Sequence, residues 1–204
     1  MSTQETLSGS NLFAAWCEPG ERRQSPFEEL LAEHHLMSIV LAAMEAEAQG
    51  MLRGGALRRE FWSDVVDFNG NFVHLCHRVK EEEHLIPALV EHGLLDAEQD
   101  NAVRHEHQSA KKLTLDIVDG VGEGDWERVL RVVSIYVHIL RPHMRREETG
   151  LFAAAVHGLP AEVDERLRAA FAAVDARALA GRGRAHFVEI ARRLAQATGV
   201  VAAL

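Results

Sequence analysis

Two segments of the sequence place a histidine four residues before a glutamate and follow it with a second glutamate. They are His77-Arg78-Val79-Lys80-Glu81-Glu82 and His143-Met144-Arg145-Arg146-Glu147-Glu148. Residues four apart lie one above the other on a helix, so each pair directs an imidazole and a carboxylate toward one point. Imidazole and carboxylate groups are ligands for iron, manganese and zinc. The sequence has no pair of cysteines at zinc-binding spacing, which argues against a structural zinc site.

Two more histidines, His34 and His107, lie on the apolar faces of other predicted helices. His34 shares its face with Leu30, Met37 and Leu41. Four helices that each direct a histidine inward, two of them also supplying a carboxylate, predict a buried site for two metal ions. Each carboxylate can bridge two cations, and burying it without a cation would be costly.

The composition narrows the class of protein. The chain has 204 residues, a mass of 22.6 kDa and 47% hydrophobic residues, which suits a single globular core. Its net charge of −9 argues against nucleic acid as a partner, because phosphate binding needs a basic surface. No segment approaches membrane-spanning length, and Cys17 and Cys76 form neither a zinc motif nor a disulfide framework. We therefore expect a soluble, cytoplasmic protein with no membrane partner.

The sequence predicts an all-α protein in three parts. We expect residues 1–25 to form an N-terminal arm, residues 26–158 a four-helix bundle and residues 159–204 a C-terminal helical extension. The extension contains two amphipathic segments, at about 161–180 and 185–198. We expect these segments to pack against the bundle or against a second subunit, as in a homodimer.

Caps and breaks place the ends of the predicted helices. Ser25 and Pro26 have the residue types of a helix start, with serine at the cap and proline at the first helical position. Three glycines within residues 120–124 predict a loop between the third and fourth helices. Pro142 lies inside the fourth helix and predicts a kink beside His143.

Four segments of the chain resemble the hemerythrin-like (HHE cation-binding) family, in the family's order and across about residues 26–158. They are Leu31-Ala32-Glu33-His34, Phe72-Val73-His74-Leu75-Cys76-His77-Arg78-Val79-Lys80-Glu81-Glu82, Glu106-His107 and Leu140-Arg141-Pro142-His143-Met144-Arg145-Arg146-Glu147-Glu148. The resemblance implies an up-down-up-down four-helix bundle around two non-haem iron ions, bridged by oxo or hydroxo groups and by carboxylates. It implies four terminal ligands and two bridging carboxylates. The terminal ligands would be His34, His77, His107 and His143, and the bridging carboxylates Glu81 and Glu147.

The sequence departs from the oxygen carriers of this family. Those proteins place a second histidine one turn along the third helix, where this chain has Lys111. The site therefore looks one imidazole short, and His74, Glu82 and Glu148 are further candidate ligands. His74 shares a helix face with His77, so its ring could reach the site.

The resemblance implies binding or activation of dioxygen, or of a related small oxidant such as peroxide or nitric oxide. Two alternatives remain open from the sequence. One is a di-iron oxidase or peroxide-consuming enzyme, whose substrate would approach the iron with fewer histidines. The other is an iron or redox sensor, in which the state of the metal controls the C-terminal helices.

Overall fold

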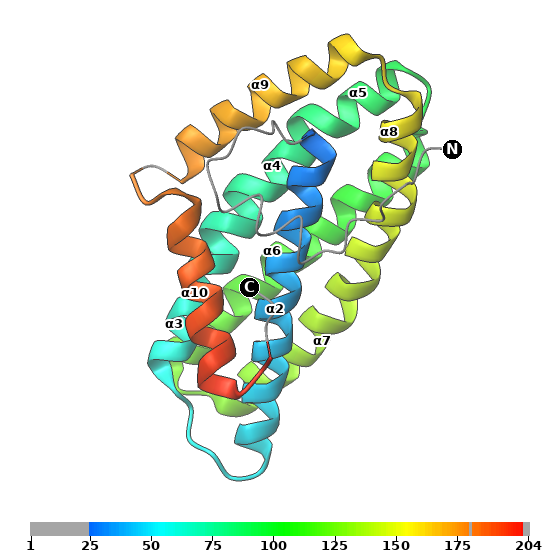
Figure 1. Cartoon of the computed structure of the whole chain (residues 1–204). Helices are drawn as coiled ribbons and strands as arrows, with labels where there is room; N and C mark the ends of the chain where they lie inside the picture. The colour runs from blue at the N-terminus through cyan, green and yellow to red at the C-terminus, as the bar shows by residue number, and fades with distance from the viewer. Residues whose placement is uncertain (1–24, 180, 202–204) are drawn as a thin grey trace, which may run out of the picture.

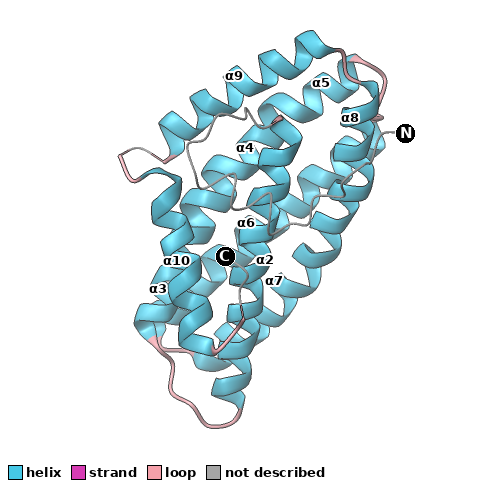
Figure 2. Cartoon of the chain, in the orientation of Figure 1, coloured by secondary structure: helices cyan, strands magenta, loops and turns pink. Residues whose placement is uncertain are grey.

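The computed structural model describes residues 25–179 and 181–201, and every regular element within these ranges is helical (Figure 1, Figure 2). This confirms the all-α fold. The predicted N-terminal arm lies outside the described residues, apart from Ser25. Four long helical stretches lie side by side as a bundle. The first stretch is α2 Pro26–Leu52, and the second runs from α3 Arg59–Asp67 to α5 Ile86–Glu91. The third is α6 Ala97–Glu123, and the fourth runs from α7 Trp126–Arg146 to α8 Ala153–Gly158.

Three of the bundle helices begin at a residue whose side chain accepts a hydrogen bond from a free backbone amide. The Ser25 hydroxyl accepts from the Glu28 amide, and the Glu28 carboxylate accepts from the Ser25 amide, which forms a reciprocal capping box. Asp96 and Asp125 accept backbone amide hydrogen bonds at the starts of α6 and α7 in the same manner. Local sequence thus fixes where three of the bundle helices begin.

The loop expected at residues 120–124 is wrong for all but its last residue. The helix α6 continues to Glu123, and only Gly124 adopts the left-handed conformation that ends it, with a φ of +73°. Gly120 lies where α6 and α7 approach closely, because a Cβ atom there would come within 2.9 Å of the Val129 side chain. This glycine therefore permits helix packing and does not break the helix.

Three π-helical stretches interrupt the second and fourth helices. They are η1 Phe68–His77, η2 Glu81–Leu85 and η3 Glu147–Phe152, with the short α4 Arg78–Lys80 between the first two. The backbone runs through Pro142 as helix, and η3 begins five residues after it. Such widened turns change which side chains share a face and occur frequently at functional sites. Here η1 ends at His77, η2 begins at Glu81 and η3 begins at Glu147.

Two apolar clusters fill the bundle, and successive helices meet them in opposite order. Along α2, Phe27 and Leu30 belong to one cluster and residues from Leu36 onward to the other. In the second stretch the order is reversed, because Phe72 comes first and packs in the cluster of Leu36, and Leu85 follows in the cluster of Leu30. The order reverses again in α6 and once more in the fourth stretch. Successive helices therefore run in alternating directions, and a polar layer lies between the clusters.

The C-terminal extension packs on the bundle as two helices, α9 Ala161–Ala178 and α10 Gly183–Thr198 (Figure 1). Val174 on α9 and Phe187 and Ile190 on α10 are fully or almost fully buried in the same apolar cluster as the middle of α2. Among the described residues, no exposed large apolar side chain belongs to α9 or α10. These helices thus bury their apolar faces within their own chain.

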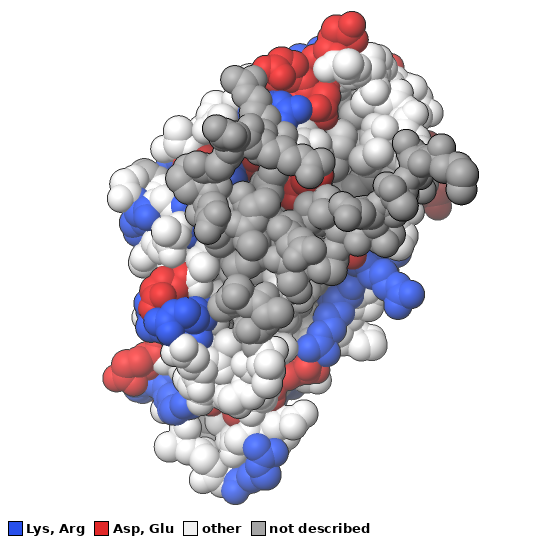
Figure 3. Space-filling model, in the orientation of Figure 1, with Lys and Arg blue, Asp and Glu red and all other residues white. Residues whose placement is uncertain are grey.

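On the face shown in Figure 3, acidic and basic side chains of the described residues are interspersed. None of the described helices combines the length and the apolar character needed to cross a bilayer.

Candidate metal centre

Four buried histidines, one from each helical stretch, meet in the polar layer. His34 comes from α2, His77 from the end of η1, His107 from α6 and His143 from α7, and each exposes 5% of its surface or less. The Nε2 atoms of His34 and His77 lie 3.1 Å apart. The His107 and His143 rings lie edge to face with centroids 4.8 Å apart. The four rings thus form two pairs.

Two buried carboxylates lie between the two pairs. Glu81 places Oε1 3.4 Å from His77 Nε2 and Oε2 3.3 Å from His107 Nε2. Glu147 places Oε2 3.4 Å from His34 Nε2 and Oε1 3.1 Å from His143 Nε2. Each carboxylate therefore presents one oxygen to each histidine pair, which is the arrangement of a ligand that bridges two cations.

The chemistry of these donors fits two metal ions. All four oxygens of Glu81 and Glu147 are buried and have no hydrogen-bond partner among the described residues. Such orphaned charged groups are costly unless a cation compensates them. Donor atoms of His34, His77, Glu81 and Glu147 lie within 4.8 Å of one another, and so do those of His107, His143 and Glu147. Histidine nitrogen and carboxylate oxygen together suit iron, manganese or zinc.

Each of the four histidines also donates its outer nitrogen, Nδ1, to a further carboxylate. The pairs are His34 with Glu148 at 3.1 Å, His77 with Glu33 at 2.8 Å, His107 with Glu82 at 2.8 Å, and His143 with Glu106 at 2.7 Å. In every pair the carboxylate comes from the preceding helical stretch, and the fourth stretch serves the first. This closed set of contacts, which we call the outer carboxylate ring, fixes the orientation of the four imidazoles and directs all four Nε2 atoms inward.

The structure brings together the six residues that the sequence selected first, and the three additional candidates contact neighbouring side chains around them. Glu82 and Glu148 belong to the outer carboxylate ring and face away from the two clusters. His74 hydrogen-bonds Thr114 at 2.9 Å through Nε2, and its Nδ1 is buried without a partner. Lys111, at the position of the missing imidazole, is exposed. The assignment of ligands itself stays a prediction.

Sequence reasoning missed Glu33 and Glu106 as positioning groups. A signal was present, because each of them directly precedes a candidate ligand, as Glu-His. Neighbouring residues on a helix differ in direction by about 100°. The glutamate therefore reaches the next helix when the histidine points inward, but the identity of that next helix is a tertiary property.

The surrounding carboxylates raise the pKa values of His34 and His107 in the metal-free protein. Burial alone would lower the pKa of His34, but its close contact with the Glu147 carboxylate and its hydrogen bond to Glu148 raise it to about 10. Burial likewise opposes the charge on His107, whose contacts with Glu147, Glu81 and Glu82 raise its pKa to about 11. Burial would raise the pKa of Glu147, and the surrounding histidines lower it instead. Without metal, protons therefore occupy part of the site at neutral pH.

We expect metal loading at pH 7 to 8 to release about two protons per chain, because metal must displace protons from His34 and His107. Affinity should consequently rise with pH until the pH exceeds these pKa values. Titration of the protein with ferrous iron in weakly buffered anaerobic solution, with an indicator dye, measures the release. A release near zero, or an affinity that falls as pH rises from 6 to 9, would contradict this expectation.

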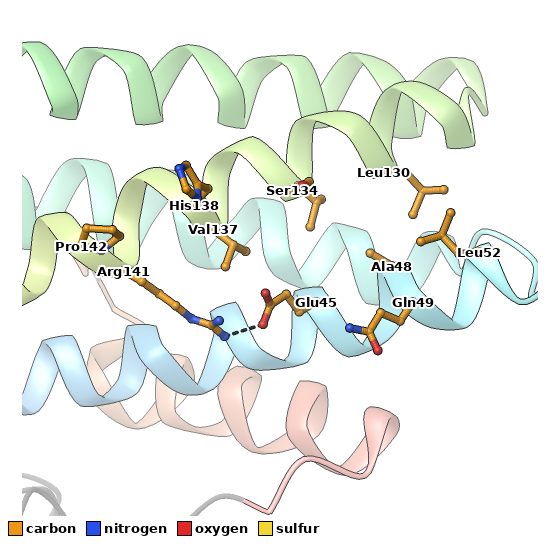
Figure 4. Close-up of a pocket in the computed structure, with 11 residues that line it drawn as sticks. Glu45, Ala48, Gln49, Leu52, Leu130, Ser134, Val137, His138, Arg141 and Pro142 are labelled. Carbon is orange, nitrogen blue, oxygen red and sulfur yellow. Dashed lines mark hydrogen bonds and ion pairs between the residues drawn. The ribbon is translucent and has the colours of Figure 1, made fainter.

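A cavity lies between α2 and α7, apart from the candidate metal centre (Figure 4). It has a volume of about 520 Å³ and is bordered by Ala48, Leu52 and Val137. Arg141 donates to Glu45 across it at 2.6 Å. None of the candidate ligands lines this cavity.

The comparison with protein families agrees with the site. The family model described as Hemerythrin HHE cation binding domain matches residues 25–155. No curated protein and no solved structure matches the chain. The matched range runs from the start of α2 into α8 and includes every candidate ligand and the whole outer carboxylate ring. The chain therefore belongs to the hemerythrin HHE cation-binding domain family.

Proposed function

We propose that the protein holds two iron ions between its two histidine pairs and there binds or activates dioxygen or a related small oxidant, peroxide or nitric oxide. The observation that carries this proposal is the placement of Glu81 and Glu147. Each presents one unpartnered buried oxygen to each histidine pair. The family match supports cation binding, and the ligand set suits iron.

The residues of the chain would hold, orient and shield the two ions. When bound, ferrous iron supplies the electrons that reduce a small oxidant. The outer carboxylate ring fixes the ring planes of the four histidines, and the apolar clusters on both sides exclude water. A reducing cytoplasmic setting, which we also propose, would keep the iron in its ferrous form.

We expect anaerobic loading with ferrous iron to give about two ions per chain, in line with a two-cation helical bundle site. Admission of dioxygen should then produce one spectral change per site that removal of oxygen reverses. Metal analysis and absorption spectroscopy measure both results. Less than about half an ion per chain would reject the di-iron proposal, whatever the oxidant.

The second candidate function is that of a di-iron oxidase or peroxide-consuming enzyme, and one cavity favours it. This cavity of about 280 Å³ reaches His143 and Glu147 and is lined mainly by apolar side chains, including Val103 and Leu151. Water occupies about 30 Å³ in the liquid, so the cavity has room for more than a diatomic molecule. It adjoins the cluster with three donor residues, whereas the other cluster has four.

Turnover distinguishes the two functions. An oxygen-binding protein consumes no more oxidant than it has sites, whereas an enzyme continues to consume oxygen or peroxide as long as a reductant is present. Steady consumption well above one equivalent per site, measured with an oxygen electrode, would favour the enzyme.

A further inference from the structure

A fully buried lysine lies in the centre of a charged cluster beside the proposed metal centre. Lys80, on α4 between His77 and Glu81, exposes none of its surface. Its ammonium donates to Glu29 at 2.7 Å and to Glu33, and it contacts Asp175 Oδ1 at 2.7 Å. Lysine is almost never fully buried unless it is paired, so these three carboxylates hold it in place.

The same cluster joins the C-terminal extension to the bundle. Asp175 belongs to α9, and Arg184 of α10 contacts both Asp175 and Glu29. The Cys76 thiol donates to Asp175 at 3.1 Å, and the Lys80 ammonium lies 5.7 Å from the centre of the Phe171 ring on α9. The extension thus contributes a carboxylate, a guanidinium and an aromatic ring to a cluster that the bundle alone would leave incomplete.

This cluster adjoins the outer carboxylate ring at Glu33. One oxygen of Glu33 accepts from Lys80 and the other accepts from His77 Nδ1 at 2.8 Å. Of the four ring carboxylates, Glu33 is fully buried, whereas Glu82, Glu106 and Glu148 expose 15%, 31% and 38% of their side chains. His77 is therefore the candidate ligand whose orientation depends on a contact with no access to water.

The charges of the cluster do not balance without the metal centre. Glu29, Glu33 and Asp175 are three carboxylates, while Lys80 and Arg184 are two cations. The remaining negative charge is offset by the His77 N–H group, and a cation on the far nitrogen of that ring makes the N–H a stronger donor. Metal and extension consequently stabilise the same carboxylate, Glu33, from opposite sides.

Resting on the di-iron centre proposed above, we propose that Asp175 of the C-terminal extension is a positioning residue for that centre. Through Lys80 and Glu33 it fixes the imidazole of His77. Because coupling between two binding events is reciprocal, docking of α9 and α10 raises metal affinity, and metal binding tightens the docking of these helices by the same factor. The extension is then the part of the chain that responds to the metal.

The test is Asp175→Asn in the full chain, with Asp164→Asn as the matched control. Asp164 is also on α9, and its ion pair with Arg168 lies within that helix. We expect ferrous iron affinity, measured anaerobically against a chromophoric chelator, to fall about tenfold in Asp175→Asn and to stay unchanged in the control. Iron should also slow hydrogen exchange in α9 and α10 of the parent protein, and do so less in Asp175→Asn.

A double variant separates positioning from general stability. If Asp175 acts through Glu33, the double variant Glu33→Gln with Asp175→Asn should bind iron with the same affinity as Glu33→Gln alone. The effects of substitutions at residues that act through one another are not additive. Arg184→Gln, which removes a more exposed partner of Asp175, provides the same comparison if Asp175→Asn does not fold. A parent protein that binds iron, with equal affinities in Asp175→Asn and Asp164→Asn, overturns this inference alone. A parent protein that binds no iron overturns the proposed function.

Discussion

Glu147→Gln is expected to lower the iron content of the protein from about two ions per chain to almost none. Glu147 is the residue whose oxygens belong to both donor clusters, one beside His34 and the other beside His143. An amide supplies only one weak oxygen donor and no charge, so one metal position loses its ligand from this residue and the other keeps only a weaker, neutral one. We expect each affinity to fall by more than the roughly 10- to 100-fold that the loss of an outer-ring partner causes. Metal analysis after anaerobic loading measures the effect.

Two further variants calibrate this result. Glu127→Gln, on the exposed start of α7, should retain both ions. Glu82→Gln weakens the contact with His107 Nδ1 and the ion pairs with Arg78 and Arg104 but leaves all six candidate ligands in place, so the stoichiometry should persist while affinity falls about 10- to 100-fold. Retention of two tightly bound ions by Glu147→Gln would show that the bridging assignment is wrong.

Removal of the metal is expected to lower the melting temperature by about 10 °C or more. Saturation at about 1,000 times the dissociation constant stabilises a fold by about 4 kcal/mol per site, and 1 kcal/mol shifts the melting temperature of a chain of this size by about 2–4 °C. The physical reason is that the metal-free protein keeps the carboxylate oxygens of Glu81 and Glu147 buried without hydrogen-bond partners. Differential scanning calorimetry of loaded and chelator-treated protein measures the shift.

The difference in melting temperature between the loaded and the metal-free protein should increase with pH. In the metal-free fold the pKa values of His34 and His107 are raised to about 10 and about 11 from the ordinary histidine value of 6.5. Their contribution to stability is therefore complete below about pH 6.5 and is lost as pH rises toward 10. Metal binding has the opposite dependence, since protons compete with it at low pH. The difference between loaded and metal-free melting temperatures should thus be larger at pH 9 than at pH 6, and an inverse trend would contradict the proposed charge states.

Helical spacing in the sequence is sufficient to predict which histidines and glutamates face the interior of the bundle. Spacings of four residues place His77 with Glu81 and His143 with Glu147 on one helix face, and apolar periodicity places His34 and His107 on core faces. The cap at Ser25 is equally local. These features depend only on helical geometry, so they can be read from neighbouring residues.

Prediction from neighbouring residues was incomplete where contacts between helices determine the structure. Glycines at residues 120–124 have the composition of a loop, yet α6 continues because Gly120 lets α7 approach. The π-helical stretches that adjoin Glu81 and Glu147 have no distinctive composition. Glu82 and Glu148 are close enough in sequence to be candidate ligands, but the structure turns them toward histidines of other helices.

The tertiary structure alone decided the contacts that join distant parts of the chain. The outer carboxylate ring pairs Glu33 with His77 across 44 residues and Glu148 with His34 across 114 residues. Lys80 meets Asp175 only because α9 packs against the second helical stretch. Periodicity tells which face of a helix is buried, but not which helix lies against that face. The partners of a buried charge are consequently fixed only when the whole bundle and its extension have packed together.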